Sequence, residues 1–154
     1  MTTEENKEIA RRAVAEGWNE QDLDVIDELY DPDYVGHWYL PGGEAGGREE
    51  LKGFMSEIFT GFPDYEMHIE FLHAEDDLVT YGFTGTGSHE GDFMGVSPSD
   101  TDSTTGRPIP GHATLRIEDG RIVEGWSTWD ALGLLQDLGV LPEDLQKASL
   151  AADD

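Results

Sequence analysis

Three side chains in this sequence could move protons without a metal or an organic cofactor: Asp130, His112 and His89. Asp130 follows Trp129 directly and stands four residues after Trp126. A carboxylate in apolar surroundings holds its proton more tightly, so one group can act first as a base and then as an acid. Imidazole changes charge between about pH 5 and 8. These residue types suit general acid–base catalysis beside a carbonyl group, with hydrogen-bond donors that hold the enolate.

Each of the three residues also has a purely structural interpretation. Asp130 stands directly before an apolar helical run, where aspartate is a preferred N-cap worth about 1 kcal/mol. His89 and His112 could each be hydrogen-bonded residues of the core or of its rim. Taken singly, the structural role is the commoner one for all three. The two interpretations lead to different experimental outcomes and both stay open here.

Hydrophobic periodicity indicates which elements position these residues. Apolar side chains recur every three or four residues in the first part of the chain and every second residue after Pro63. Asp119-Gly120 is a strong signal for a tight hairpin turn. The expected helices are residues 3–18, 22–30, 48–60 and 131–138, and the expected strands are 65–73, 78–88, 107–117 and 121–129. The order predicts an α+β fold in which helices pack on one face of a curved antiparallel sheet, so that His112 and His89, on neighbouring strands, could point into one cavity.

The composition is dominated by acidic residues. The 154-residue chain has 34 Asp and Glu against nine Lys and Arg, a formal net charge of −25, and these acids are spread along its whole length. Such a field repels phosphate backbones and anionic membranes, which argues against a nucleic-acid or membrane partner. An acidic shell of this kind is typical of proteins that work in concentrated salt, and we expect a halophilic protein.

Several classes of site find no support in the sequence. It has no cysteine, which excludes disulfides and thiolate chemistry. Motifs for a nucleophilic serine, a phosphate-binding loop, a zinc protease or an EF-hand are missing, and the five histidines lack metal-ligand spacing. We therefore expect no metal and no cofactor. The N-terminus does not read as a signal peptide and no apolar run is long enough to span a membrane, so we expect a cytoplasmic protein.

A series of short segments resembles the SnoaL-like polyketide cyclases, also called ester cyclases. Each segment is short, and their order and spacing carry the resemblance from about Glu4 to Leu141, with a lengthened stretch at 99–104. The segments are residues 6–12, 18–24, 27–30, 33–37, 87–91, 93–96, 105–107, 119–126 and 130–139.

The resemblance implies an NTF2-like cone, in which three N-terminal helices cover a strongly bent sheet around a deep apolar pocket, followed by a short C-terminal helix. It also implies a homodimer formed through the outer face of the sheet, and ring closure by intramolecular aldol condensation without a cofactor. The family's acid–base aspartate lies in the strand before the last helix. In an ungapped match that position is Ser127, and Asp130 is the nearest acid.

These expectations define a candidate pocket and two candidate functions. We expect a single domain over residues 1–146 and a flexible acidic tail at 147–154. The first function is cofactor-independent acid–base chemistry on a small apolar carbonyl compound, an aldol cyclisation or related isomerisation. The second is a non-catalytic protein that binds an apolar small molecule or a protein partner. The residues expected to line the pocket are Trp18, Tyr34, His37, Trp38, Phe54, Phe59, Trp126 and Ser127.

Overall fold

The N-terminal part of the chain is helical, as its periodicity predicts. We describe a computed structural model over residues 1–40, 43–44, 46–98 and 107–140. Helix α1 (Thr3–Arg12) begins at a capping box between Thr2 and Glu5, and it continues without a break as the π-helical segment η1 (Ala13–Asn19). Helix α2 (Leu23–Leu29) is capped by Asp22, and α3 (Arg48–Gly61) follows after β1 and β2.

The strands form one six-stranded sheet in the order β2-β1-β6-β5-β4-β3. Neighbouring strands from β3 to β6 pair antiparallel, and β5 and β6 are joined by the predicted turn, in which Asp119 and Gly120 both have positive φ. A short helix, α4 (Ala131–Asp137), follows β6 directly. The strands are β1 (Tyr30–Leu40), β2 (Gly43–Glu44), β3 (Glu66–Glu75), β4 (Leu78–Thr86), β5 (Ile109–Glu118) and β6 (Arg121–Trp129).

Strand β1 is the main difference from the sequence expectation. It joins the sheet beside β6, with Val35 opposite Glu124, and it runs parallel to that strand. The sheet is therefore mixed, where an antiparallel one was expected. Helix α2 ends at Leu29 because Asp31 precedes a proline, which disfavours helical backbone, and the chain then continues in the extended conformation.

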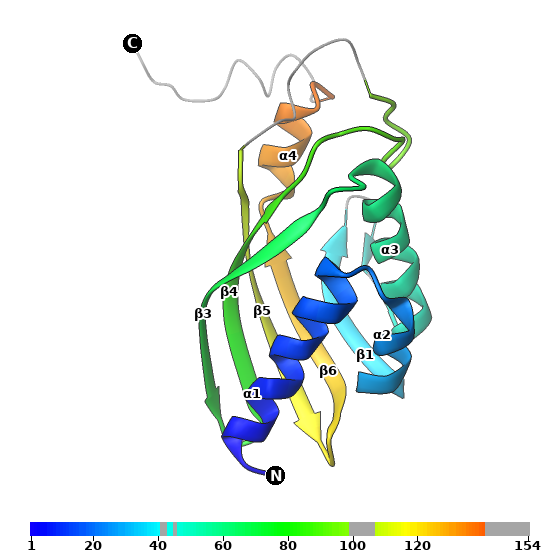
Figure 1. Ribbon diagram of the computed structural model, residues 1–154. Coiled ribbons are helices and arrows are strands. Elements are labelled where there is room, and N and C mark those ends of the chain that lie inside the picture. Colours follow the sequence, from blue (N-terminus) through cyan, green and yellow to red (C-terminus); the bar gives the residue numbers. More distant parts are fainter. Residues whose placement is uncertain (41–42, 45, 99–106, 141–154) are drawn as a thin grey trace.

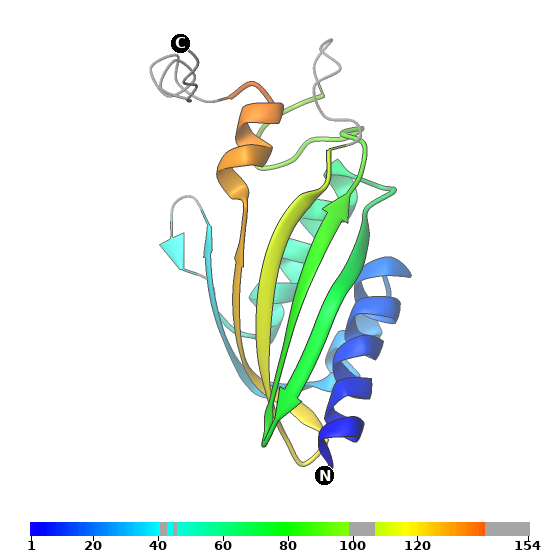
Figure 2. The ribbon, with the colours of Figure 1, turned by 90° about the vertical axis from the view of Figure 1, so that its left-hand side faces the viewer.

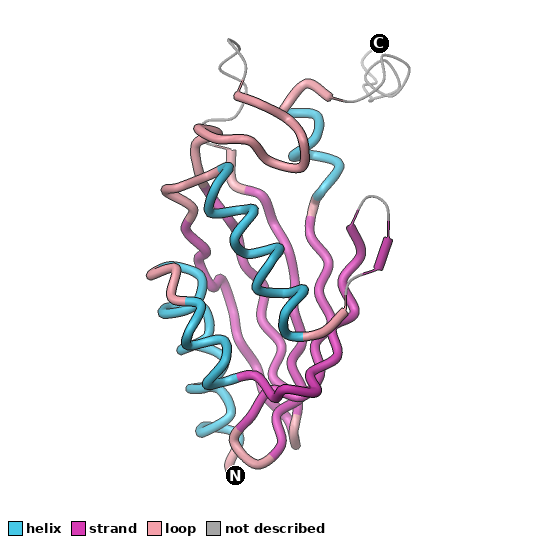
Figure 3. Tube along the Cα trace, turned by 90° about the vertical axis from the view of Figure 1, so that its right-hand side faces the viewer, coloured by secondary structure: helices cyan, strands magenta, loops and turns pink. Residues whose placement is uncertain are grey.

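The helices and the sheet form two layers (Figures 1 and 3). Helices α1 to α3 cover one face of the curved sheet, called the inner face below, while α4 lies at the end where β6 stops. Figure 2 shows the opposite, outer face, over which no described helix passes. The core lies between the layers, and its largest fully buried side chains include Ile26, Met55, Val79 and Ile122. The predicted α+β cone is confirmed.

Some expectations fall on residues outside this description. The lengthened stretch at 99–104, the domain boundary at 146 and the acidic tail at 147–154 all lie there. In the described ranges, no helix is both long and apolar enough to cross a membrane.

Candidate functional site

A cavity of about 130 Å³ lies between the helices and the inner face of the sheet. It extends from the start of β1 to α4, and residues from η1, α3 and all the long strands border it. Nearly half of the residues that line it are aromatic, and such a surface fits a flat apolar molecule. The aromatic residues that line it are Trp18, Tyr30, Tyr34, Trp38, Phe54, Phe62, Tyr65, Tyr81, Phe83, Phe93 and Trp129. Trp126 borders the cavity as well, although its ring stacks on His37 on the outer face of the sheet, with centroids 5.4 Å apart.

Small residues on the inner face make room for the large ones. The alternation of β6 turns Gly125 and Ser127 toward the cavity, and a Cβ atom added at Gly125 would lie 2.6 Å from the Tyr34 hydroxyl. Gly85 on β4 has the same relation to Tyr65, whose hydroxyl would lie 2.6 Å from an added Cβ. Glycine at these two positions therefore lets the phenol rings lie directly on the sheet.

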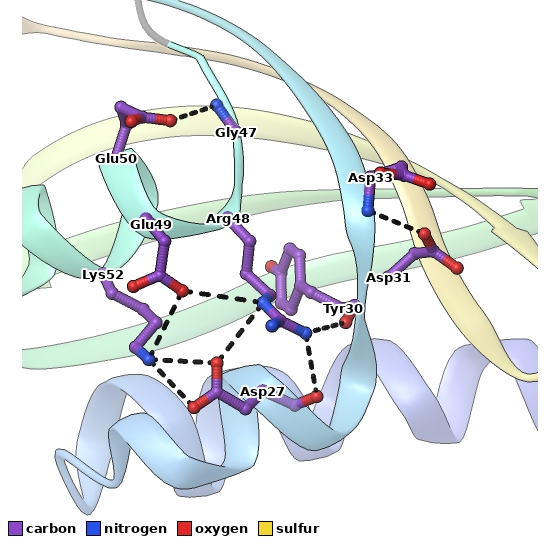
Figure 4. A network of polar contacts seen from close by, with 9 residues as sticks. All are labelled: Asp27, Tyr30, Asp31, Asp33, Gly47, Arg48, Glu49, Glu50 and Lys52. Atoms are coloured by element: carbon purple, nitrogen blue, oxygen red, sulfur yellow. Dashed lines mark hydrogen bonds and ion pairs between the residues drawn. The ribbon is translucent and has the colours of Figure 1, made fainter.

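The start of β1 is held in place by charged residues of α3 (Figure 4). The Arg48 guanidinium donates hydrogen bonds to the backbone oxygens of Asp27 and Tyr30, at 3.3 and 3.2 Å. Lys52 Nζ binds both carboxylate oxygens of Asp27, at 2.9 and 3.0 Å. These contacts fix α3 across the junction of α2 and β1, and so they fix the position of the Tyr30 ring.

Three tyrosines form the buried end of the cavity. Tyr30, Tyr34 and Tyr81 are each at most 5% exposed, and the rings of Tyr30 and Tyr34 meet edge to face with centroids 4.8 Å apart. Burial raises the pKa of Tyr34 to about 12, and burial followed by the neighbouring phenols raises the pKa of Tyr30 and Tyr81. All three groups therefore remain O–H donors at neutral pH. Within the described residues, none of the three O–H groups donates to an acceptor of the chain, and the Tyr34 oxygen has the indole N–H of Trp38 beside it.

Charged groups appear at the opposite end, the mouth, beside α4. Arg107 Nε donates to Asp137 Oδ2 at 2.7 Å, and Arg107 Nη1 lies 4.0 Å from Asp130 Oδ2. Among the described lining residues, Arg107 and Asp137 are the only charged ones. The Arg107 side chain is 48% exposed, so this end of the cavity is open to water.

Six of the eight residues expected to line the pocket do so: Trp18, Tyr34, Trp38, Phe54, Trp126 and Ser127. The other two, Phe59 and His37, are absent from the lining, which corrects the expectation for them. Phe59 packs edge to face on Trp18, with ring centroids 6.1 Å apart. His37 precedes the inward-facing Trp38 on β1 and so points to the outer face, where its Nε2 lies 2.8 Å from Glu124 Oε2.

None of the three proposed proton-transfer residues lines the cavity. The Asp130 carboxylate caps α4, accepting a 2.9 Å hydrogen bond from the Gly133 N–H. His112 is exposed on the outer face of β5, with its ring 5.7 Å from that of Phe71, because strand alternation turns its neighbours Gly111 and Ala113 inward. The His89 ring stacks on Phe62 at 5.3 Å. The structure thus brings neither histidine to Asp130 inside the cavity.

Sequence reasoning missed Tyr30, Tyr81, Arg107 and Asp137. The alternation of β4 contained a signal for Tyr81, because it shares a face with the buried Val79 and Phe83. Asp137 follows Leu134 by three residues and therefore shares its helix face. In the described ranges, no cluster of three or more His, Asp or Glu side chains could hold a metal ion.

The family model for the SnoaL-like polyketide cyclases matches residues 8–138. This chain belongs to the SnoaL-like polyketide cyclase family. No curated protein matches it. Solved structures that are similar include a candidate SnoaL-like polyketide cyclase from Jannaschia sp. CCS1, at 27% identity and a TM-score of 0.77 over 91% of this chain and 95% of that one.

Two Streptomyces proteins are similar at slightly higher identity. AclR from Streptomyces galilaeus, a candidate hydroxylase, is 31% identical with a TM-score of 0.77, over 92% of this chain and 100% of its own. IdmH from Streptomyces antibioticus, a candidate polyketide cyclase, is 30% identical with a TM-score of 0.71, over 88% and 99% of the two chains.

As a SnoaL-like protein with the NTF2-like cone, the chain carries Ser127 where the resemblance places the acid–base aspartate. Ser127 lies opposite Ala113 in the sheet and faces the cavity. A serine hydroxyl can donate or accept a hydrogen bond but does not ionise as a carboxylate does. The carboxylate that lines this cavity, within the described part of the chain, is Asp137 at the mouth.

Proposed function

We propose that this SnoaL-like protein binds a small, largely apolar carbonyl compound in its cone and moves protons on it without a cofactor. The observation that carries the proposal is an aromatic cavity whose described lining has one carboxylate, Asp137, at the mouth. An aromatic lining selects a flat apolar body, and a carboxylate at its edge is the group type that acts as a base beside a carbonyl.

The proton would move in two balanced steps. Asp137 takes a proton from the carbon beside a carbonyl group, the C–H electron pair becomes a carbon–carbon double bond, and the carbonyl oxygen takes the negative charge. In a ring closure, the enolate carbon then bonds to a second carbonyl carbon of the same molecule. The new alkoxide takes the proton back from Asp137. Arg107, 2.7 Å from Asp137, would orient the carboxylate throughout.

Asp130 has a separate part in this proposal. Its carboxylate caps α4 and lies 4.0 Å from the Arg107 guanidinium, so it would help to position Arg107. The hypothesis that Asp130 itself is the acid–base group, assisted by His112 or His89, stays a prediction, and it is compared with Asp137 below.

A second candidate function is binding without catalysis. It is favoured by the buried end of the cavity, whose lining of tyrosines has no carboxylate or imidazole among the described residues. Fold alone does not separate the two functions, because the same fold can support many activities.

The two functions separate in a proton-exchange experiment that needs no knowledge of the natural substrate. The protein is incubated in deuterium oxide with 6-methoxy-1-tetralone, an aryl ketone with oxygen atoms at opposite ends, and NMR follows the replacement of hydrogen by deuterium beside the ketone. An enzyme of the proposed type accelerates the exchange over buffer. Saturable binding without accelerated exchange would establish the binding protein instead.

We further propose a two-fold dimer through the outer face of the sheet. The middle of this face is formed by uncharged side chains on neighbouring strands, among them Phe71, Thr80, Thr114 and Trp126, and Phe71 is 45% exposed. In a chain with a net charge of −25, such a face is where two copies repel each other least.

Sedimentation in molar KCl tests the dimer, because salt screens the repulsion between the two acidic shells. We expect twice the chain mass of 17.0 kDa. Replacing the exposed Phe71 by Glu should return the mass to that of one chain, while the same change at Leu132, exposed on α4, should leave it unchanged. A wild-type mass of 17.0 kDa under these conditions would exclude the dimer.

A further inference from the structure

Tyr30, Tyr34 and Tyr81 line the buried end of the cavity, and within the described residues none of their O–H groups donates to an acceptor of the chain. The rings of Tyr30 and Tyr34 are in contact, with centroids 4.8 Å apart, and burial followed by the neighbouring phenols raises the pKa of Tyr30 and Tyr81. Buried polar groups in folded proteins are nearly always hydrogen-bonded, and leaving one unbonded is unfavourable. Three such groups side by side therefore form a feature that folding alone does not explain.

The three hydroxyls cannot satisfy one another completely. In an open chain of hydroxyl groups each O–H donates to the next oxygen, and the last O–H is left without an acceptor. The indole N–H of Trp38 adds a fourth donor: it lies beside the Tyr34 hydroxyl and lowers the pKa of that group, but it reaches hydrogen-bond geometry with no described acceptor. The buried end thus has more donors than acceptors.

The surroundings decide which kind of acceptor fits. No described lining residue is cationic except Arg107, which lies at the mouth and is paired with Asp137. A charged anion that entered this end would lose its hydration and gain only hydrogen bonds from neutral donors, which is unfavourable. The net charge of −25 would repel it as well. An uncharged carbonyl oxygen accepts two hydrogen bonds and has no such penalty.

We propose that Tyr30, Tyr34 and Tyr81 form a binding site for the carbonyl oxygen of a ketone or quinone at the buried end of the ligand. This inference rests on the proposed function, since it assumes that the cavity binds an apolar carbonyl compound. It adds that the ligand has oxygen atoms at two ends: one held by the tyrosines, and a second, reacting carbonyl near Asp137. The tyrosines would then set which end of the molecule reaches the mouth.

The experiment compares two probes that differ in the oxygen, 1-tetralone and its hydrocarbon counterpart tetralin. Their affinities are measured by calorimetry on the wild type and on the variants Tyr34→Phe and Tyr81→Phe, which keep the ring and lose the hydroxyl. We expect each variant to bind 1-tetralone about five- to tenfold more weakly, as the loss of one hydrogen bond implies, and to bind tetralin at least as tightly as the wild type.

Tyr65→Phe is the matched control. It makes the same chemical change in the same cavity, but its hydroxyl lies over Gly85 and its ring packs against Trp18, with ring centroids 5.7 Å apart. The ratio of the two affinities should stay at the wild-type value in this variant. Infrared spectra of bound 1-tetralone add a second readout, because hydrogen bonds lower the C=O stretching frequency, and Tyr34→Phe and Tyr81→Phe should raise it again.

The possible failures are distinguishable. Equal affinity ratios in all four proteins, with an unshifted C=O stretch, would overturn the carbonyl site while leaving the cavity as a binding site. Failure of the wild type to bind either probe would overturn the proposed function, and the carbonyl site with it. Thermal unfolding of each variant confirms that the proteins compared are folded.

Discussion

The two ends of the cavity differ in the charge and burial of their polar side chains. At the mouth, Arg107 and Asp137 are charged, paired with each other at 2.7 Å and in reach of water. At the buried end, Tyr34 and Tyr81 are neutral and almost fully buried, and within the described residues neither O–H donates to an acceptor of the chain. A hydroxyl costs far less to bury than a charge. On the proposed function, the ligand is recognised at the buried end of the cavity and reacts at the mouth.

The largest expected effect separates Asp137 from Asp130 at the mouth. Asp137→Asn keeps the shape and removes the base, so the exchange rate of 6-methoxy-1-tetralone should fall by about 10²–10⁴-fold. Asp130→Asn keeps the α4 cap, because asparagine caps as well as aspartate, and both stability and exchange should change little. NMR and thermal unfolding check both variants. The reverse result, with exchange lost in Asp130→Asn alone, would assign the acid–base role to Asp130.

The buried end should be sensitive to one added methyl group. In Gly125→Ala the new Cβ would lie 2.6 Å from the Tyr34 hydroxyl, and we expect a loss of about 1–3 kcal/mol in the free energy of unfolding as the ring is displaced. Gly53→Ala is the matched control, since nothing lies within 4 Å of an added Cβ there. That change in helix α3 should stabilise the protein by about 0.5–1 kcal/mol. Denaturant unfolding gives both values, and similar changes at the two sites would contradict the close packing of Tyr34.

Two neighbouring residues of β4 allow a comparison between a hydroxyl that has a hydrogen-bond partner in the chain, Thr80, and one that has none among the described residues, Tyr81. Tyr81→Phe removes a hydroxyl that donates to no acceptor within the described residues, and the ligand-free protein should become more stable by about 1 kcal/mol. Thr80 donates to the Ala113 carbonyl and lies 2.9 Å from the Thr114 hydroxyl, so Thr80→Val should cost about 1 kcal/mol. Denaturant unfolding measures both. A loss of stability in Tyr81→Phe would mean that the chain itself satisfies this hydroxyl.

The smallest effect concerns the outer face. The hydrogen bond to His37, and then the one from Arg116, lowers the pKa of Glu124 below its ordinary value. A depressed folded pKa contributes stability above the unfolded pKa of about 4.3, and this contribution is lost as pH falls through the folded pKa. Glu124→Gln should therefore lower the free energy of unfolding at pH 7 by less than about 1 kcal/mol, and by less still at low pH. Glu118→Gln, on the exposed end of β5, should show no such pH-dependent difference.

The local elements of the fold could be predicted from the sequence, and the pairing of β1 could not. The change of period after Pro63 and the Asp119-Gly120 turn are local signals, and they predict the bounds of β3 to β6 to within two residues. The proline at position 32, just after the end of α2, is a local signal as well. The partner of β1, strand β6, lies at the other end of the chain, and no local pattern indicates a pairing over that distance.

The residues of the candidate site could likewise be predicted only where a local sequence pattern indicates them. Aromatic residues such as Trp38 and Phe54 were expected to line the cavity, because large apolar side chains on the inward faces of a strand and a helix have few other places to go. The choice between Asp130 and Asp137 depends on how α4 sits on the sheet. Arg107, far away in sequence, helps to fix this by binding Asp137. Such tertiary contacts decide which acid faces the ligand.

The parallel pairing of β1 with β6 affects the order in which the parts of the protein can fold during synthesis. The β3–β4 and β5–β6 hairpins join neighbours in sequence and can form early, whereas β1 must wait for β6, most of a chain length away. Tyr30 and Tyr34 lie on β1, so the closed end of the cavity cannot exist until synthesis has passed Trp129. During translation the N-terminal helices and β1 emerge first and are left with their apolar faces uncovered. The protein should therefore acquire its ligand-binding ability in a single late step.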